Sequence, residues 1–119
     1  MSEFLDRAVQ AHVQWKIKLL TAINGGEIPN RQTACDDHCC ELGTWIYADG
    51  QSLNEHTEFR ELQEQHKKFH TTVGKVIDLV VAKKIPEAKS EINTGDFAQC
   101  SSATVRSIAK LKAAALVTV

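Results

Sequence analysis

The stretch FRELQEQHKKFHTTVGKVIDLV, residues 59–80, decides the fold because an inward-facing residue recurs at every third or fourth position. This spacing places the recurring residues on one face of an α-helix. The face consists of Phe59, Leu62, His66, Phe69, Val73, Val76 and Val80. We expect Asn54 to cap this helix and the helix to fade near Lys83. His70 follows His66 by one turn, so both imidazoles project toward nearly the same side.

A similar helical face comes earlier in the chain. It consists of Leu5, Ala8, His12, Trp15, Leu19 and Ala22. The segment Asn24-Gly25-Gly26 should end this helix, because glycine adopts the left-handed conformation found after helices. His12 therefore faces a core, as His66 does. A buried imidazole costs roughly several kcal/mol unless its nitrogens have partners, so these histidines require an explanation.

The rest of the chain is also expected to be helical. Residues 27–34 are expected to form a loop, and a shorter helix should run from about Asp36 to Tyr47. A short helical piece should follow Pro86 and end near Asn93, and a last helix should run from Asp96 toward Leu116. We therefore predict an all-α single domain over residues 1–119. Its expected architecture is an antiparallel four-helix bundle with a short extra helical segment before the last helix.

A thiol accompanies the histidines. Cys40 opens the pattern C-x-L-G-x-W at residues 40–45. On a helix, the side chain of the neighbouring Cys39 would point about 100° away, while His38 is near enough to be a substitute ligand. Three imidazoles and one thiolate complete a tetrahedral shell for Zn²⁺. The predicted metal ligands are His12, Cys40, His66 and His70.

Two other interpretations of these residues compete with zinc binding. A single inward histidine is commonly a hydrogen-bonded core residue, and a single cysteine is commonly a small buried apolar residue. A hemerythrin-like di-iron site would need bridging carboxylates at inward positions. The glutamates on the helix of His66 do not share its face, which disfavours iron. They are Glu55, Glu58, Glu61 and Glu64.

Composition excludes several classes of function. The net charge is −1, so no electrostatic argument favours nucleic acid or an anionic membrane. No apolar run approaches the roughly 18 residues that a membrane-spanning helix needs, and the N-terminus does not resemble a secretory signal. Cysteine usage fits a cytoplasmic protein. Four protein ligands leave no open metal position, and no catalytic triad or phosphate loop is present, so we do not expect an enzyme.

The order and spacing of three patterns identify a relative. H-x-x-W begins at His12, C-x-L-G-x-W at Cys40 and H-x-x-x-H at His66, with intervening gaps of 27 and 25 residues between these positions. Together they resemble the bacterial chemoreceptor zinc-binding (CZB) domain over roughly Leu5 to Val80. The resemblance implies a cytoplasmic, homodimeric sensory or regulatory domain. Its output would be a chemoreceptor signalling region or a diguanylate cyclase, in the same chain or as a partner protein.

The sequence leaves three hypotheses for what the site does. In the first, zinc-dependent rearrangement of the first helix controls a chemotaxis or cyclic-di-GMP output. In the second, oxidation of the Cys40 thiolate makes the site a redox sensor, and the resemblance to the family implies hypochlorous acid as one such oxidant. In the third, the zinc is purely structural. Whether the chain is free-standing or part of a larger receptor or cyclase is also open.

Overall fold

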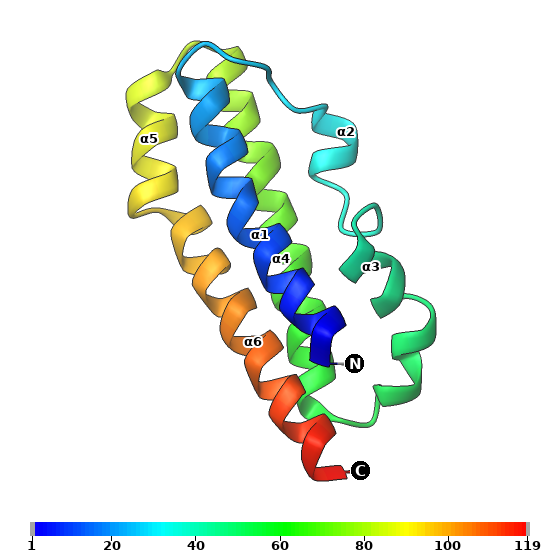
Figure 1. Ribbon diagram of the computed structural model, residues 1–119. Coiled ribbons are helices and arrows are strands. Elements are labelled where there is room, and N and C mark those ends of the chain that lie inside the picture. Colours follow the sequence, from blue (N-terminus) through cyan, green and yellow to red (C-terminus); the bar gives the residue numbers. More distant parts are fainter. Residues whose placement is uncertain (1, 119) are drawn as a thin grey trace.

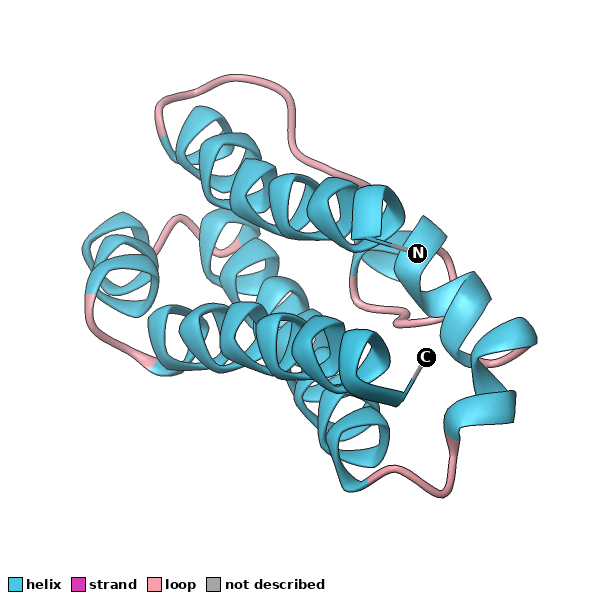
Figure 2. Cartoon of the chain, turned by 60° about the horizontal axis from the view of Figure 1, so that its bottom comes forward, coloured by secondary structure: helices cyan, strands magenta, loops and turns pink. Residues whose placement is uncertain are grey.

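The computed structural model describes the backbone of residues 2–118 and the side chains of residues 3–114. This part of the chain is helical with connecting loops and contains no strand (Figure 2), as the sequence predicts. No helix among these residues is both long and apolar enough to span a bilayer. The elements are α1 Ser2–Ile23, α2 Arg31–Ala34, α3 Glu41–Ile46, the 3₁₀ helix η1 Asp49–Leu53, α4 Thr57–Val81, α5 Ile85–Asn93 and α6 Asp96–Thr118.

Three long helices, α1, α4 and α6, pack side by side and form the body of the molecule (Figure 1). Helices α1 and α4 run in the same direction. The chain returns from α1 through the short elements α2, α3 and η1, and it returns from α4 through α5 and α6. The molecule is elongated, with extents of 49 × 24 × 21 Å.

Both α1 and α4 end with the same backbone motif. After α1, the Gly25 N–H donates to the Ala22 carbonyl and the Gly26 N–H donates to the Thr21 carbonyl. Gly25 has φ +91°, the left-handed conformation that glycine adopts without cost. After α4, Lys83 takes the corresponding position with φ 62°. The expected ends of both helices are therefore confirmed.

The return segment between α1 and α4 departs from the prediction. The expected helix from Asp36 to Tyr47 is wrong in its first five residues, because α3 begins only at Glu41. A carboxylate oxygen of Asp36 accepts the His38 N–H at 2.9 Å, and such local side-chain bonds compete with helix formation. The expected loop over residues 27–34 also contains the single turn α2.

The expected start of α4 is also wrong. Its capping position is His56, and Asn54 instead ends the unpredicted helix η1. The Asn54 carbonyl accepts a hydrogen bond from Arg60 at 2.7 Å. Asn54 therefore stabilises the turn before α4 through its backbone and does not cap the helix.

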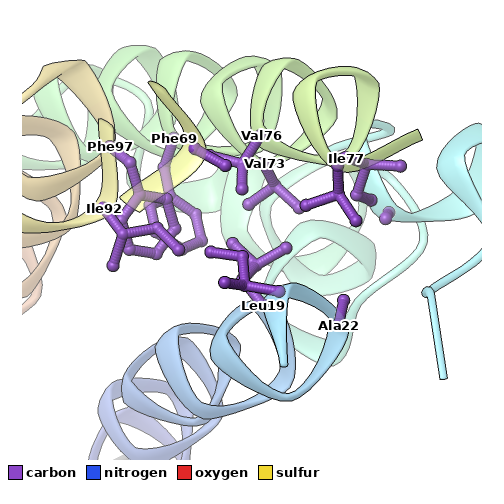
Figure 3. Close-up of a cluster of buried hydrophobic side chains, with 12 residues drawn as sticks. Leu19, Ala22, Phe69, Val73, Val76, Ile77, Ile92 and Phe97 are labelled. Carbon is purple, nitrogen blue, oxygen red and sulfur yellow. The ribbon is translucent and has the colours of Figure 1, made fainter. Parts of the chain in front are cut away.

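Two hydrophobic clusters fill the interior, one toward each end. The first joins α1, α2, α4, α5 and α6, and its centre includes Leu19, Val73 and the aromatic pair Phe69 and Phe97 (Figure 3). The two phenylalanine rings lie 5.4 Å apart between centroids. The second cluster joins α1, α3, α4 and α6. It consists of Leu5, Ala8, Leu42, Ile46, Phe59, Leu62, Ile108 and Leu111. At roughly 1.5–3 kcal/mol for each fully buried large side chain, both clusters contribute strongly to folding.

Gly43 permits the close approach that fixes the segment before α3. A Cβ atom at this position would lie 1.7 Å from the Asp37 carbonyl oxygen and 3.2 Å from the His38 Cα. The backbone that approaches Gly43 so closely is the chain just before α3.

Gly43→Ala should therefore destabilise the protein by roughly 1–3 kcal/mol, because a backbone clash cannot be relieved by rotating a side chain. Urea denaturation of the metal-free protein measures this change. Glu41→Ala on the same helix is the control. It removes only an exposed ion pair with Arg7 and should cost less than about 1 kcal/mol. Equal stability of the Gly43 and Glu41 variants would contradict the proposed clash.

Candidate metal centre

A buried polar layer separates the two hydrophobic clusters. Along α1, His12 lies between Ala8 of one cluster and Leu19 of the other. Along α4, His66 follows Leu62, and His70 follows Phe69 of the other cluster. All three imidazoles are almost completely buried, with exposed fractions of 2% or less. Cys40 completes the layer from the start of α3 and is half-buried.

The structure brings the four sequence-predicted ligands together. One potential ligand atom from each of His12, Cys40, His66 and His70 lies within 4.8 Å of all the others. The ring centroids of His66 and His70 are 4.6 Å apart, and that of His12 lies 5.0 Å from His66. Three segments far apart in the sequence therefore converge on one point.

Hydrogen bonds fix the proton position on two of the three rings. The Nδ1 atom of His12 lies 2.7 Å from the Ala8 carbonyl oxygen, and that of His70 lies 2.8 Å from the Ala34 carbonyl oxygen. Because a carbonyl can only accept, each Nδ1 must carry the proton. In the neutral rings, both Nε2 atoms are left as acceptors. Bonds of this kind also orient histidines that bind metals.

These acceptors lack sufficient donors in the protein. Among the described residues, no hydrogen-bond partner reaches the buried Nε2 atom of His12. Nδ1 of His66 is also buried without a partner, but one ring cannot offer both nitrogens to the same ion. The Sγ atom of Cys40 lies 3.2 Å from Nε2 of His66 and 3.7 Å from Nε2 of His70. A single thiol proton can satisfy only one of these nitrogens. A cation at the centre would satisfy several of them at once.

The separations match the donor set of zinc. Typical Zn–N and Zn–S bond lengths in a tetrahedron imply nitrogen–sulfur separations of about 3.6 Å. The two sulfur–nitrogen distances at Cys40 lie on either side of this value. Among the described residues, the cluster contains no carboxylate, whereas a di-iron site would require bridging carboxylates. The residues present therefore fit Zn²⁺.

Burial keeps the imidazoles neutral. It lowers the pKa of His12 to about 4, against the opposing effect of its bond to the Ala8 carbonyl. Burial, together with the neighbouring His70 and His12, lowers the pKa of His66 to about 2. Burial also lowers the pKa of His70 and raises that of the Cys40 thiol. Neutral imidazoles are the form that binds metals, while the thiol needs a cation to favour its ionised form.

Cys40 is positioned by its own helix. It is the N-terminal capping residue of α3, and its Sγ accepts the Gly43 N–H at 3.2 Å. The prediction that Cys40 and not Cys39 faces the histidines rested on a helical phase, and this reason is wrong because neither residue is inside a helix. Cys39 is exposed and does not belong to the cluster.

A small polar network that the sequence analysis missed holds the segment before Cys40. The Tyr47 hydroxyl donates to a carboxylate oxygen of Asp37, and the Tyr47 ring stacks on His38 with centroids 3.8 Å apart. Asp37 is buried, and burial together with this bond raises the pKa of Tyr47 to about 12. The ten-residue separation of Tyr47 and Asp37 carries no sequence signal for this contact.

Helix α2 is held in place by contacts with α4. Arg31 donates two hydrogen bonds to the Asp78 carboxylate, at 2.6 and 3.0 Å. Gly74 leaves room for Cys35, because a Cβ atom at Gly74 would lie 2.8 Å from the Cys35 Cβ. These contacts position the Ala34 carbonyl, which accepts the hydrogen bond from His70. Cys35 thus has a packing role outside the cluster.

The remaining histidines, and Trp15 and Cys100, lie outside the cluster. His38 is exposed, and His56 is partly buried at the start of α4. Trp15 packs beside the cluster, with its ring centroid 6.3 Å from that of His70. Cys100 packs against the hydrophobic cluster that contains Phe97.

Comparison with known proteins agrees with this geometry. The family model described as "Chemoreceptor zinc-binding domain" matches residues 12–77, which is more than half of the chain. The chain belongs to this family. The matched region begins at His12 and includes Cys40, His66 and His70. The family consists of sensory and regulatory domains, not catalytic ones. Searches of curated proteins and of solved structures gave no match.

The metal-free protein should lose stability as the pH falls from about 6.5 to 4. The ordinary pKa of a histidine side chain is 6.5, and the pKa of His12 in the folded protein is about 4, so the unfolded chain binds this proton first. The stability is therefore complete above pH 6.5, and His12 alone accounts for a loss of about 3 kcal/mol by pH 4. Urea unfolding at several pH values measures this loss of stability. His12→Leu should reduce the pH dependence. Equal stability of the wild-type protein at pH 7.5 and pH 5 would contradict the prediction.

Proposed function

We propose that this protein binds one zinc ion per chain through His12, Cys40, His66 and His70 and acts as a sensory or regulatory domain. The observation that carries the proposal is the convergence of these four donors at one buried point, together with the buried Nε2 atom of His12, which has no partner among the described residues. The proposed zinc supplies the missing cation, and membership of the family supports this choice. We propose no enzymatic activity.

The proposal extends to the organisation of the protein. Residues 1–119 would form a single domain with the plan of an antiparallel four-helix bundle, in which α2, α3 and η1 together take the place of the second helix and α5 is the short extra segment before α6. It would act in the cytoplasm as a homodimer. Its output would be a chemotaxis or cyclic-di-GMP signal, through a chemoreceptor signalling region or a diguanylate cyclase.

The positions of the ligands suggest how a signal arises. Helix α4 contributes both His66 and His70 and packs along α6. Helix α1 contributes His12, and the start of α3 contributes Cys40. When the four donors share an ion, α1 and α3 are both held against α4. When they do not, His12 has a buried acceptor without a partner, which favours movement of α1 away from α4.

A redox role is the second candidate. Cys40 is the one member of the cluster that is not fully buried. Oxidation of its sulfur would remove one donor and would have the same mechanical effect as zinc loss. A purely structural zinc is the third candidate, and it differs from both because the ion would remain bound throughout signalling.

Purified protein should contain about one zinc ion per chain, as measured by elemental analysis, and Cys40→Ala should weaken zinc affinity by at least about a hundredfold because it removes a ligand. Cys39→Ala is the matched control, since Cys39 is adjacent but exposed. Competition with a chromophoric chelator measures both affinities. Iron in place of zinc, or a larger effect from Cys39→Ala, would refute the assignment.

Zinc removal should loosen α1 without unfolding the protein. Hydrogen exchange should become faster in residues 3–24 and 36–47, while α4 and α6 stay protected, because their apolar contacts do not involve the site. Uniform loss of protection would indicate a structural zinc. Unchanged exchange in α1 would show that the ion does not hold this helix.

The chain should be a dimer in solution at micromolar concentrations. The outer side of α1 exposes about half of Val13 and of Ile17, with Val9 and Leu20 partly buried beside them. Ile17→Lys should shift the mass measured by light scattering toward that of a monomer, because it places a charge in an apolar contact. Thr71→Lys on α4 is the control. A monomeric wild-type chain would remove the homodimer from the proposal.

A further inference from the structure

A cavity of about 280 Å³ reaches the proposed metal site from one side. Its floor includes Ala34, Cys40 and His70. The cavity opens to solvent and leaves room for a small ligand beside Cys40 and His70. His12 and His66 do not line this cavity. The cluster therefore has an asymmetric environment, with two donors at a cavity and two enclosed between helices.

The rim of the cavity is exposed and polar. It includes Lys18, Thr33 and Cys39, all of which are exposed. Trp15 forms part of the wall, and the Lys18 ammonium lies 4.7 Å from the centroid of the Trp15 ring. This cation–π contact holds the charge of Lys18 at the cavity. The described lining contains no carboxylate. The carboxylates of Asp36 and Asp37 act on His70 from outside the lining, and that of Asp37 acts on Cys40, so the preference for a negatively charged ligand rests on Lys18.

We propose that this cavity is the access route to the metal site and that it takes small anionic ligands. These ligands would be amino-acid-sized molecules with a thiolate or carboxylate donor, attracted by Lys18 and brought into contact with Cys40 and His70. The inference rests on the proposed metal site for its biological meaning. Access to Cys40 can nevertheless be measured on the metal-free chain, so a failure of zinc binding and a failure of this route are distinguishable.

Alkylation of Cys40 by iodoacetate and by iodoacetamide tests the route and its charge preference. The two reagents are similar in size and differ in charge. We use the metal-free Cys39→Ala chain and follow each remaining thiol by peptide mass analysis. Lys18→Gln should lower the ratio of iodoacetate to iodoacetamide rates at Cys40 by about threefold, the effect of one nearby charge in water. The ratio at Cys100 should not change, because Cys100 lies outside this cavity.

A second pair of variants tests the route by its shape. Thr33→Trp places a large side chain on the rim and should slow both reagents at Cys40 at least tenfold. Ala109→Trp adds the same side chain at an exposed position of α6 and is the matched control. Unchanged Cys100 reactivity shows that a variant is folded. In zinc-loaded protein, Thr33→Trp should also slow zinc transfer to mercaptoacetate while the zinc dissociation constant stays within about twofold.

The possible results of these alkylation experiments lead to different conclusions. An unchanged Cys40 rate in folded Thr33→Trp overturns the access route. A slower rate in Thr33→Trp with an unchanged reagent ratio in Lys18→Gln overturns the preference for anions. If Thr33→Trp does not fold, the Lys18→Gln ratio still decides the proposal, because a change confined to Cys40 requires Lys18 to face the path of the reagent.

Discussion

The need to satisfy buried imidazole nitrogens is the constraint on which the rest of this structure depends. The three histidines interrupt what would otherwise be one continuous apolar core and divide it into two clusters. Two of the rings direct a proton to a backbone carbonyl, which leaves acceptor nitrogens facing one another and a thiol. Such an arrangement is unfavourable without a central cation. The apolar clusters on both sides provide the rigidity that holds the donors at this separation.

The irregular return segment follows from the same constraint. In a long regular helix opposite α4, the distance of a cysteine sulfur from the helix axis would be fixed by the helix geometry. Here the chain instead places Cys40 at the first position of a short helix, where its sulfur also accepts the Gly43 N–H. Short elements are individually weak, so side-chain contacts fix them: Arg31 with Asp78 for α2, and Tyr47 with Asp37 before α3.

The sequence predicted the parts of the molecule that depend on periodicity. Helical spacing predicted the buried faces of α1 and α4 and, with them, the inward position of the histidines. The ends of these helices near Gly25 and Lys83 were also predicted. The segment from Asp36 to Cys40 was not predictable in this way, because the Asp36–His38 bond and the clearance at Gly43 are decided by contacts between nearby backbone segments. The pairing of Tyr47 with Asp37 likewise depends on how α3 packs.

The start of α1 and the end of α6 lie toward the same end of the molecule (Figure 1). His12 lies near the middle of α1, about 15 Å along the axis from Ser2 at 1.5 Å per residue. If release of His12 lets α1 tilt about Leu19, which is held in the hydrophobic cluster around Phe69, α1 acts as a lever. The start of α1 then moves about two and a half times as far as His12, because Ser2 lies 17 residues from Leu19 and His12 lies 7. The start of α1 would then move relative to the adjacent end of α6. A sub-ångström change among four donors could thus become a displacement large enough for another protein surface to detect.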